Sequence, residues 1–484
     1  MLKKYSVTFA GQILVYIAGF LLIPIIVKTS GTEVYGAYVI IVSFLGILTG
    51  VSSLGTGFLV KRFLPSIDNK EERANIFYPQ FYFNILSSIL LGIIAFLSFS
   101  IIEEYLLGGD VDFDEYLVVL YLILYILYTQ TTDVFRYTHK VNLFNISTTL
   151  YPYIFLIIIV LWYRFDEIIT INTLIISQII ALAVVFVSLL LPSIKSVSFK
   201  LTWYKKYTFI KDIKYGFPLM IVVIFELIIS VSDRYVIASY MDLDSVAFYT
   251  IAYSVSSIPL LLPKVIGIVL PPIMSKLKDK GEQDKVESMI NLAVLIFSIF
   301  LIPFIFGVIM LGDPLLSLYA NKETAVAVSG LLPIISMAIF FYGIGSILSS
   351  ILFVDMKTKK ILLVSTVVGL LNLIANIAIF SIIANIYVAA WTTFCSYFLY
   401  MVLIYSQINK EYVIELLNIK IIKIALASVV MAAVLYLMNA LNFNFYTIEG
   451  LLFGVIVGCI VYFASLFVSK VITYKDLVLL IDQK

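Results

Sequence analysis

Apolar runs of about twenty residues follow one another along almost the whole chain, and each could cross the ~30 Å hydrocarbon layer of a bilayer as a helix. Of the 484 residues, 62% are hydrophobic and 13% charged. Ordinary soluble domains carry about 25% charged residues, so that class is excluded. We therefore expect an all-α polytopic membrane protein with about fourteen transmembrane helices, at residues 5–27, 35–60, 76–101, 116–135, 142–163, 168–191, 214–238, 245–274, 288–311, 325–354, 361–382, 385–406, 420–440 and 447–469.

The basic residues orient these spans. With both termini in the cytoplasm, nearly all of the 32 Lys and Arg residues fall in cytoplasmic segments. The exceptions are four outer residues, Lys28, Arg164, Arg234 and Lys322, and Lys264 inside a span. Because short basic loops stay on the cytoplasmic side, the alternation supports fourteen spans in the plasma membrane.

Two stretches of the chain resemble each other at a fixed spacing. Residues 35–73 begin with a tyrosine-rich helix start and end in a charged loop, and residues 244–285 repeat this order. An offset of 211 residues places Tyr38 on Tyr249 and Asp68 on Asp279. Such a repeat is typical of an internally duplicated transporter. Between the halves, residues 193–212 alternate Lys with aromatic residues, which predicts an amphipathic linker along the anionic inner leaflet.

Ionisable residues within spans are candidate functional residues. A charge in hydrocarbon is costly unless it faces a water-filled cavity or has a partner of opposite charge. Glu226 and Lys264 lie in successive predicted spans, each twelve residues from the basic residue that ends its span, Lys214 or Lys276. That distance is about 18 Å along a helix, so the two charges have similar depth and could face one cavity. The alternative is a buried ion pair that only joins two helices.

Other charged residues lie nearer to the ends of spans. Asp133 and Arg136 share one face near the inner end of span four, which suits a gate or simple extension toward the cytoplasm. Asp233 and Arg234 mark the outer end of span seven and suit an outer gate or an ordinary helix end. Together with Lys28 at the end of span one, they are also candidates for substrate binding in the cavity.

Uncharged polar residues inside spans are open to two interpretations. Tyr38 and Tyr249 could stack on sugar rings, although packing inside a helix bundle accounts for them as well. Asn372 and Asn376 lie one turn apart in span eleven and are expected to hydrogen-bond between helices.

No pattern for an enzyme or a cofactor is present in the sequence. There is no phosphate-binding loop, no dinucleotide-binding glycine motif and no metal-ligand cluster. The two cysteines, Cys395 and Cys459, lie in apolar runs, so a disulfide framework is excluded. The longest predicted outer loop has about fourteen residues, too few for the acid and base groups of a sugar polymerase. We expect a non-enzymatic protein without metal, cofactor or nucleic-acid partner.

Short motifs in a fixed order resemble those of the polysaccharide flippases in the multidrug/oligosaccharidyl-lipid/polysaccharide (MOP) superfamily. The motifs are Tyr35-Gly36-Ala37-Tyr38, Ser53-Leu54-Gly55 before Lys61-Arg62, Tyr215-Gly216-Phe217-Pro218-Leu219, Ser232-Asp233-Arg234-Tyr235 and Val246-Ala247-Phe248-Tyr249. The resemblance covers essentially the whole chain. It implies two six-helix lobes in a V-shaped, MATE-like arrangement, at 1–192 and 214–408, joined by the linker 193–213. Helices thirteen and fourteen, in 409–484, would be the addition that holds a lipid tail.

The resemblance also implies a substrate and a mechanism. A polyprenyl-diphosphate-linked oligosaccharide would be moved across the membrane by alternating access, for O-antigen (lipopolysaccharide), capsule or exopolysaccharide assembly. Lys264 would meet the diphosphate, and polysaccharide polymerases and other assembly proteins would be partners. If Lys264 is the resting partner of Glu226, the arriving diphosphate would free this carboxylate, which could then couple transport to H⁺ or Na⁺. Span one has no internal arginine, only Gln12 and the terminal Lys28, which disfavours a peptidoglycan precursor. The alternatives are a cation-coupled drug or metabolite antiporter of the same superfamily and a polysaccharide polymerase or ligase.

Overall fold

The computed structural model describes residues 2–109, 111–165, 168–408, 412–416 and 418–471. Over these residues the secondary structure is helical, without a strand. Thirteen of the described helices are long and apolar enough to cross a membrane. The predicted class, an all-α multi-pass membrane protein, is therefore confirmed.

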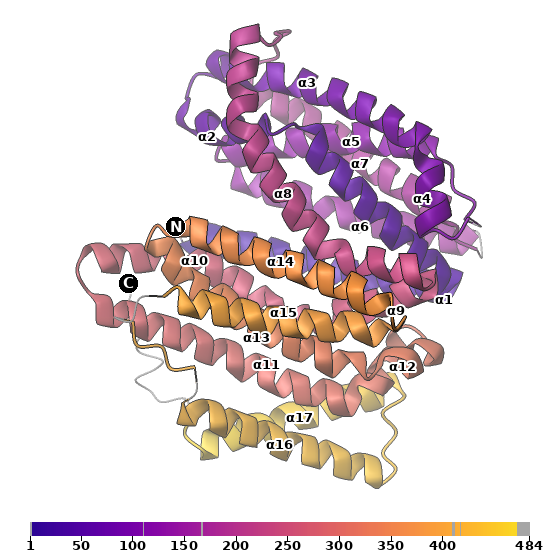
Figure 1. The fold of residues 1–484 in the computed structure, drawn as a ribbon, viewed down its shortest axis with the longest axis vertical. Coiled ribbons are helices and arrows are strands. Elements are labelled where there is room, and N and C mark those ends of the chain that lie inside the picture. Colours follow the sequence, from indigo (N-terminus) through magenta and orange to yellow (C-terminus); the bar gives the residue numbers. More distant parts are fainter. Residues whose placement is uncertain (1, 110, 166–167, 409–411, 417, 472–484) are drawn as a thin grey trace. The chain divides into compact units, whose positions relative to one another are not determined.

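The chain forms two compact units, Met1–Ala247 and Phe248–Lys484 (Figure 1). The described part of the first unit holds the α-helices α1 (Leu2–Ser52), α2 (Gly57–Phe63), α3 (Lys70–Leu97), α4 (Phe99–Leu106), α5 (Tyr116–Tyr137), α6 (Val141–Phe165), α7 (Ile171–Ser196) and α8 (Lys206–Tyr240). Helix α9 (Leu243–Ser256) leads into the second unit, which holds α10 (Leu261–Asp279), α11 (Gln283–Tyr319), α12 (Lys322–Val328), α13 (Leu331–Val354), α14 (Thr358–Phe380), α15 (Ile386–Ser406), α16 (Ile419–Ala440) and α17 (Ile448–Val468).

Helix α1 contains the first predicted span, 5–27, and the second, 35–60, as far as Ser52. Its 51 residues include one non-helical position, Gly31, with φ of 87° and ψ of 172°. A straight helix of this length would measure about 76 Å, far more than a bilayer needs. Gly31 breaks the helix because a residue without Cβ can adopt a positive φ without strain. The start of α1 and the start of α2 lie at the same end of the first unit, so the chain turns back between them (Figure 1).

The two longest predicted spans, 245–274 and 325–354, are each divided in the structure. The first consists of α9, a 3₁₀ turn at Ile258–Leu260 and α10, and Pro259 lies in that turn. Proline has no N–H and cannot continue the hydrogen bonding of an α-helix, which accounts for the break. The second consists of α12 and α13, which meet at Ser329 and Gly330. Both predicted spans are longer than one helix needs to cross a bilayer, and these breaks take up the excess length.

Side-chain caps fix where many of the helices begin. An Asn or Thr side chain accepts a hydrogen bond from a backbone N–H in the first turn at six helix starts, those of α3, α7, α12, α15, α16 and α17. The first N–H groups of a helix have no partner within it, so these oxygens supply one. At α15, α16 and α17 the cap lies at or close to the start of a predicted apolar run, so it is a local signal for where these spans begin.

The proposed duplication appears in the interior of both units. Tyr38 is 8% exposed, and its hydroxyl accepts a hydrogen bond from Gln178 Nε2 of α7 at 2.7 Å. Tyr249 is fully buried, and its hydroxyl lies 3.4 Å from Thr393 Oγ1 of α15. The two tyrosines thus make equivalent contacts with the last helix of each predicted six-helix half.

The segment between α7 and α8 extends without helix from Val197 to Lys205. Phe199 and Trp203 are 65% and 61% exposed, and each has one ring against α3, at Tyr78 and Tyr82 respectively. The described packing also places α8 against α1 within the first unit. The two units therefore divide after Ala247, while the predicted domain limits at 193–213 follow the loop between spans.

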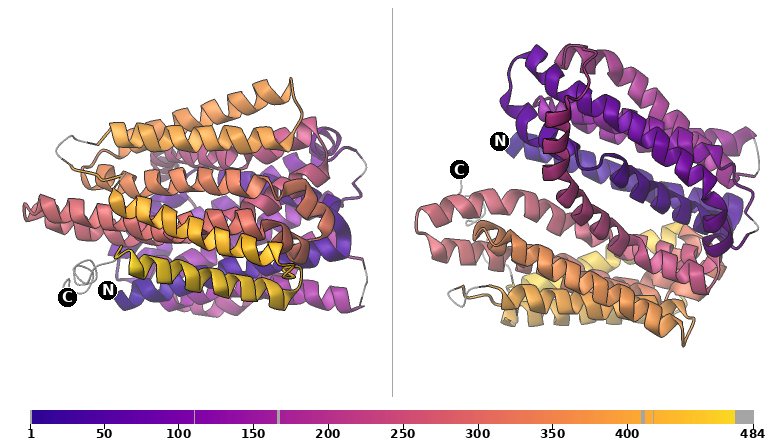
Figure 2. Two further views of the ribbon diagram at one scale, coloured as in Figure 1. Left: turned by 90° about the horizontal axis from the view of Figure 1, so that it is seen from below. Right: turned by 45° about the horizontal axis from the view of Figure 1, so that its top comes forward.

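The last two described helices form a hairpin. Helices α16 and α17 pack against each other and against α11, as their yellow ribbons show in Figures 1 and 2. Lys423 Nζ near the start of α16 donates to the carbonyl of Ser469 after α17 at 2.9 Å. The hairpin is thereby closed at the end where it joins the rest of the second unit.

Candidate functional site

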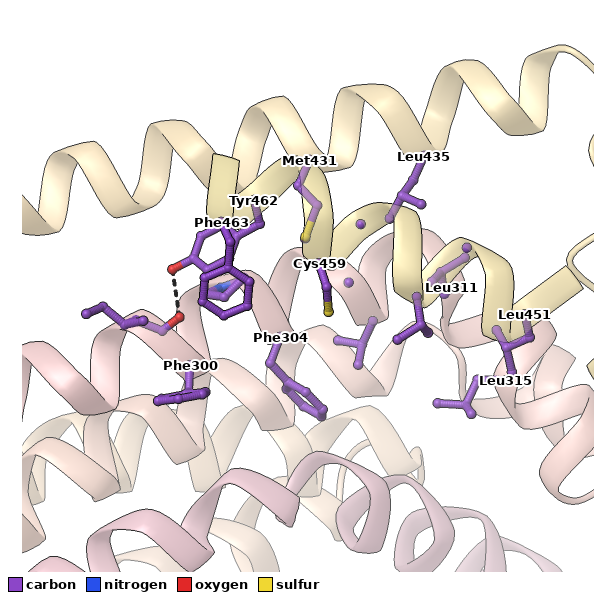
Figure 3. A pocket seen from close by; sticks show the side chains of 17 residues that line it. Phe300, Phe304, Leu311, Leu315, Met431, Leu435, Leu451, Cys459, Tyr462 and Phe463 are labelled. Atoms are coloured by element: carbon purple, nitrogen blue, oxygen red, sulfur yellow. Dashed lines mark hydrogen bonds between the residues drawn. The ribbon is translucent and has the colours of Figure 1, made fainter. Parts of the chain in front are cut away.

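A groove runs between α11 and the α16–α17 hairpin, and its cavity volume is about 400 Å³. The side chains from the three helices point into it in Figure 3. Its lining is apolar and consists of Ile299, Phe300, Pro303, Phe304, Gly307, Val308, Leu311 and Leu315 of α11, Met431 and Leu435 of α16, and Leu451, Gly454, Val455, Gly458, Cys459, Tyr462 and Phe463 of α17. We call this cavity the apolar groove. Its volume is within the range of small-molecule sites.

Glycines leave room for the apolar groove. A Cβ added to Gly307 would meet no other heavy atom within 4 Å, so this position faces open space. On α17, a Cβ on Gly454 would lie 2.6 Å from the Phe445 ring, which is a clash. Gly454 therefore permits the close approach of the turn before α17. Gly307 instead widens the groove itself.

The polar groups near the groove are satisfied within the protein. Pro303 lacks an N–H, so the carbonyl of Ile299 four residues earlier has no partner along its own helix. The hydroxyl of Tyr462 donates to this carbonyl at 2.7 Å, the dashed line in Figure 3. Because this bond uses both groups, the groove keeps an apolar surface at a proline kink.

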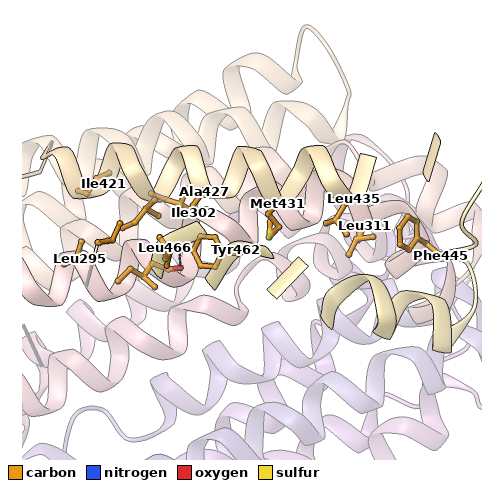
Figure 4. Packing of buried hydrophobic residues seen from close by; sticks show 13 residues of the cluster. Leu295, Ile302, Leu311, Ile421, Ala427, Met431, Leu435, Phe445, Tyr462 and Leu466 are labelled. Carbon is orange, nitrogen blue, oxygen red and sulfur yellow. Dashed lines mark hydrogen bonds between the residues drawn. The ribbon is translucent and has the colours of Figure 1, made fainter. Parts of the chain in front are cut away.

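A cluster of buried hydrophobic residues packs next to the groove, between α11 and the α16–α17 hairpin. Leu295, Ile302, Ile424 and Tyr462 belong to this cluster, which joins α11 to both helices of the hairpin (Figure 4). Close packing of this kind holds the hairpin at a defined distance from α11. The groove can thus receive a hydrocarbon chain, whereas a sugar or phosphate placed there would lose its hydrogen bonds to water.

Lys264 and Glu226 lie in different units. Lys264 is the fourth residue of α10, directly after Pro263, and its side chain is exposed. Glu226 lies in the middle of α8, and its side chain falls outside the described part of the structure. The shared cavity predicted for this pair stays a prediction.

Three further predicted residues lie near the end of α8 and near the break inside α1. Arg234 Nη1 donates to the carbonyl of Ser230 one turn earlier at 3.1 Å, and Asp233 beside it is half-buried. Lys28 is exposed, three residues before the break at Gly31. Their roles in substrate binding remain predictions.

Asp133 and Arg136 lie at the end of α5. Asp133 is half-buried, and Arg136 is exposed with its guanidinium 5.6 Å from the centre of the Phe144 ring. This ring contact suits a side chain that reaches past apolar surface toward water. A gating role for the pair stays a prediction.

The predicted hydrogen bonding of the interior asparagines is present. Asn376 Nδ2 donates to Asn372 Oδ1 at 3.2 Å within α14, and Thr392 Oγ1 of α15 donates to Asn376 Oδ1 at 2.5 Å. The pair therefore joins α14 to α15, as expected for polar residues inside a helix bundle. In the described parts of the chain, no three His, Cys, Asp or Glu side chains gather as metal ligands would.

The apolar groove was not predicted from the sequence. One signal was available, since Gly450, Gly454 and Gly458 recur at four-residue spacing along α17. Small residues at this spacing mark a helix face that packs closely on a neighbour. They do not reveal a cavity, because its width depends on the path of α11, which has Pro303 and Pro314 inside it.

The helices described above define a multi-pass membrane transporter fold, and comparison with known proteins places it among the MOP flippases and transporters. Residues 1–278 match the family described as polysaccharide biosynthesis protein, and residues 218–378 match MatE. The first match covers more than half of the chain, so this protein belongs to the polysaccharide biosynthesis protein family. Both families are of the flippase or transporter type, and the resemblance seen in the sequence is confirmed.

Solved structures show the same fold. The lipid II flippase MurJ in an inward closed conformation aligns over 99% of this chain and 100% of its own, at 18% identity and a TM-score of 0.74. An inward-facing MATE-family multidrug transporter aligns over 83% of this chain and 92% of its own, at 11% identity and a TM-score of 0.61. The MATE multidrug transporter DinF-BH aligns over 84% and 94%, at 16% identity and a TM-score of 0.59. No curated protein sequence matches the chain.

Proposed function

We propose that this protein is a flippase that moves polyprenyl-diphosphate-linked oligosaccharides from the inner to the outer leaflet by alternating access, for O-antigen, capsule or exopolysaccharide assembly. The observation that carries the proposal is the apolar groove built by α11 and the α16–α17 hairpin. A lipid-linked sugar has a long hydrocarbon tail, and a groove without free hydrogen-bonding groups fits it. The family match at residues 1–278 supports the same substrate class.

The two ends of such a substrate need different protein groups. The diphosphate is anionic, and Lys264 on α10 supplies a cation for charge-assisted hydrogen bonds. The tail lies in the apolar groove, away from water. Both sites belong to the second unit, so one unit would hold both ends of the substrate.

The membrane orientation follows from the same proposal. Both termini lie in the cytoplasm, and the substrate is delivered to the external side, as the distribution of basic loops favours. A reporter fused after Lys285 is then cytoplasmic and one after Asp112 external; both on one side would contradict this orientation. Polysaccharide polymerases would receive the substrate on the outer face.

A cation-coupled drug antiporter is the second candidate, because residues 218–378 match MatE. The multidrug transporter structures align over 83% and 84% of this chain, whereas the MurJ structure aligns over 99%. The chain therefore matches a flippase over nearly its full length. This coverage favours a lipid-linked substrate over a soluble drug.

The deciding experiment uses a strain of the source organism that lacks this gene. We expect lipid-linked oligosaccharide to accumulate on the inner leaflet and surface polysaccharide to disappear, with both restored by the wild-type gene. Drug susceptibility is measured in the same strains. Increased susceptibility with normal surface polysaccharide would refute the flippase and support the antiporter.

A further inference from the structure

A buried carboxylate joins three segments of the second unit at one end of its helices. Asp355 follows α13 directly, and its side chain is 4% exposed. It accepts hydrogen bonds from Lys278 Nζ in the last turn of α10, from Lys357 Nζ at 3.1 Å, and from the Tyr412 hydroxyl at 3.0 Å. We call these four residues the carboxylate clamp. It connects α10, the end of α13 and the segment that leads into α16.

The surroundings of Asp355 keep it charged. Burial would by itself raise its pKa, but the hydrogen bonds from Lys278, Lys357 and Tyr412 outweigh burial and hold the pKa of the carboxyl below its ordinary value. The stability that this carboxylate adds is therefore present above its unfolded-state pKa of about 3.9 and is lost only as pH falls through the lower folded value. The clamp stays closed at neutral pH.

The segment held by Tyr412 is also fixed to α11. The side-chain amide of Asn291 donates to the carbonyl of Val413 at 3.0 Å and accepts from the N–H of Glu415 at 3.0 Å. Glu415 then accepts from Asn418 Nδ2 at 3.0 Å, and Asn418 caps α16. These hydrogen bonds, together with the backbone from Tyr412 to Glu415, thus connect α10 through Asp355 to the start of the hairpin.

We propose that the carboxylate clamp is a positioning device that ties α10 to the α16–α17 hairpin, so that the helix carrying Lys264 and the helices lining the apolar groove move together. A substrate with a charged head and an apolar tail gains from this link, because its two ends must be carried in one step. The link to transport rests on the proposed function. The mechanical link itself does not.

Tyr412 offers the sharpest test of the clamp. Tyr412→Phe removes one hydroxyl and keeps the buried ring and the Lys278–Asp355 pair. A matched control lies at the opposite end of the hairpin, where the Tyr446 hydroxyl donates to Asp313 Oδ2 of α11 at 3.1 Å. Tyr446→Phe removes the same kind of tyrosine–carboxylate bond without touching α10.

The distance between α10 and α16 is measured by pulsed electron resonance on the full-length protein in nanodiscs. Spin labels are placed at the exposed positions Lys280→Cys and Ile422→Cys, with Cys395→Ser and Cys459→Ala as background. We expect a narrow distance distribution in the reference protein and after Tyr446→Phe, and a clearly broader one after Tyr412→Phe. A distribution that stays narrow after Tyr412→Phe would overturn the clamp.

Transport is then measured for the same tyrosine variants, in the gene-deletion strain and without labels. We expect Tyr412→Phe to slow the movement of lipid-linked sugar by about fivefold or more, the range of an ordinary coupling between sites, and Tyr446→Phe to leave it unchanged. A broadened distance with undiminished transport would overturn the role in transport. If the wild-type protein itself moves no lipid-linked sugar, the proposed function fails, and the distance measurement still decides the mechanical link.

Discussion

At the residue scale, the Tyr462 hydroxyl supplies a hydrogen-bond donor that the Ile299 carbonyl lacks within its own helix. Pro303 removes the N–H that the Ile299 carbonyl needs, and the Tyr462 hydroxyl replaces it at 2.7 Å. The sequence shows the proline, but the tyrosine that compensates lies 163 positions from Ile299. Pairings over such separations depend on the folded path of the chain, so only the asparagine contacts within and next to α14 could be predicted beforehand.

Lys264 should be required for transport because it is the proposed partner of the diphosphate. Removal of a charge-assisted hydrogen bond costs about 1.5–3 kcal/mol, so Lys264→Ala should lower transport roughly tenfold to a hundredfold. Lys264→Arg should keep part of the activity, since the charge remains while its geometry changes. The measurement is the initial rate of transport in the deletion strain at matched membrane protein levels. Normal transport by Lys264→Ala would show that the lysine is no binding residue.

Glu226 is proposed to couple transport to a gradient of H⁺ or Na⁺. If it pairs with Lys264 at rest, an arriving diphosphate would compete for the lysine and free the carboxylate to bind a cation. Glu226→Gln should then remove the dependence of the transport rate on pH and sodium. If the variant keeps the same dependence as the wild type, Glu226 has only a structural role. Replacement of both Glu226 and Lys264 by apolar residues serves as the control for folding, because the double variant leaves no lone buried charge.

At the scale of helices, the sequence predicted where apolar runs begin and end more reliably than how they bend. The Asn and Thr caps of α15, α16 and α17 stand at or close to the predicted starts of spans. Gly31 and Pro259, in contrast, change the course of the chain inside a predicted continuous run or between two runs. The apolar groove depends on the path of α11, which contains Pro303 and Pro314, and on the open space at Gly307, so the positions of the apolar runs alone did not reveal it.

At the scale of the whole molecule, the chain combines a predicted repeat, one copy in each unit, with an additional hairpin, α16–α17. The contacts of Tyr38 with Gln178 and of Tyr249 with Thr393 repeat one arrangement in both units. The α16–α17 hairpin has no counterpart in the first unit, whose described helices end with α8. The sequence predicted the repeat and the two extra helices. It could not show that the extra helices form a groove with α11, because that depends on packing across the second unit.

We propose that the apolar groove holds the lipid tail, and Gly307→Leu is designed to block this site. A leucine here extends into open space, so it should fill the groove without disturbing the fold. Ile309→Phe, two residues away on an exposed face of α11 outside the groove, is the matched control for added bulk.

The measurement is the rate at which purified protein in proteoliposomes moves a fluorescent polyprenyl-diphosphate sugar between leaflets. The wild type and Ile309→Phe should move it at the same rate. Gly307→Leu should be slower by about tenfold or more, since even one methylene group in an apolar site changes discrimination by this order. A Gly307→Leu protein that moves the lipid-linked sugar as fast as the wild type would contradict the account.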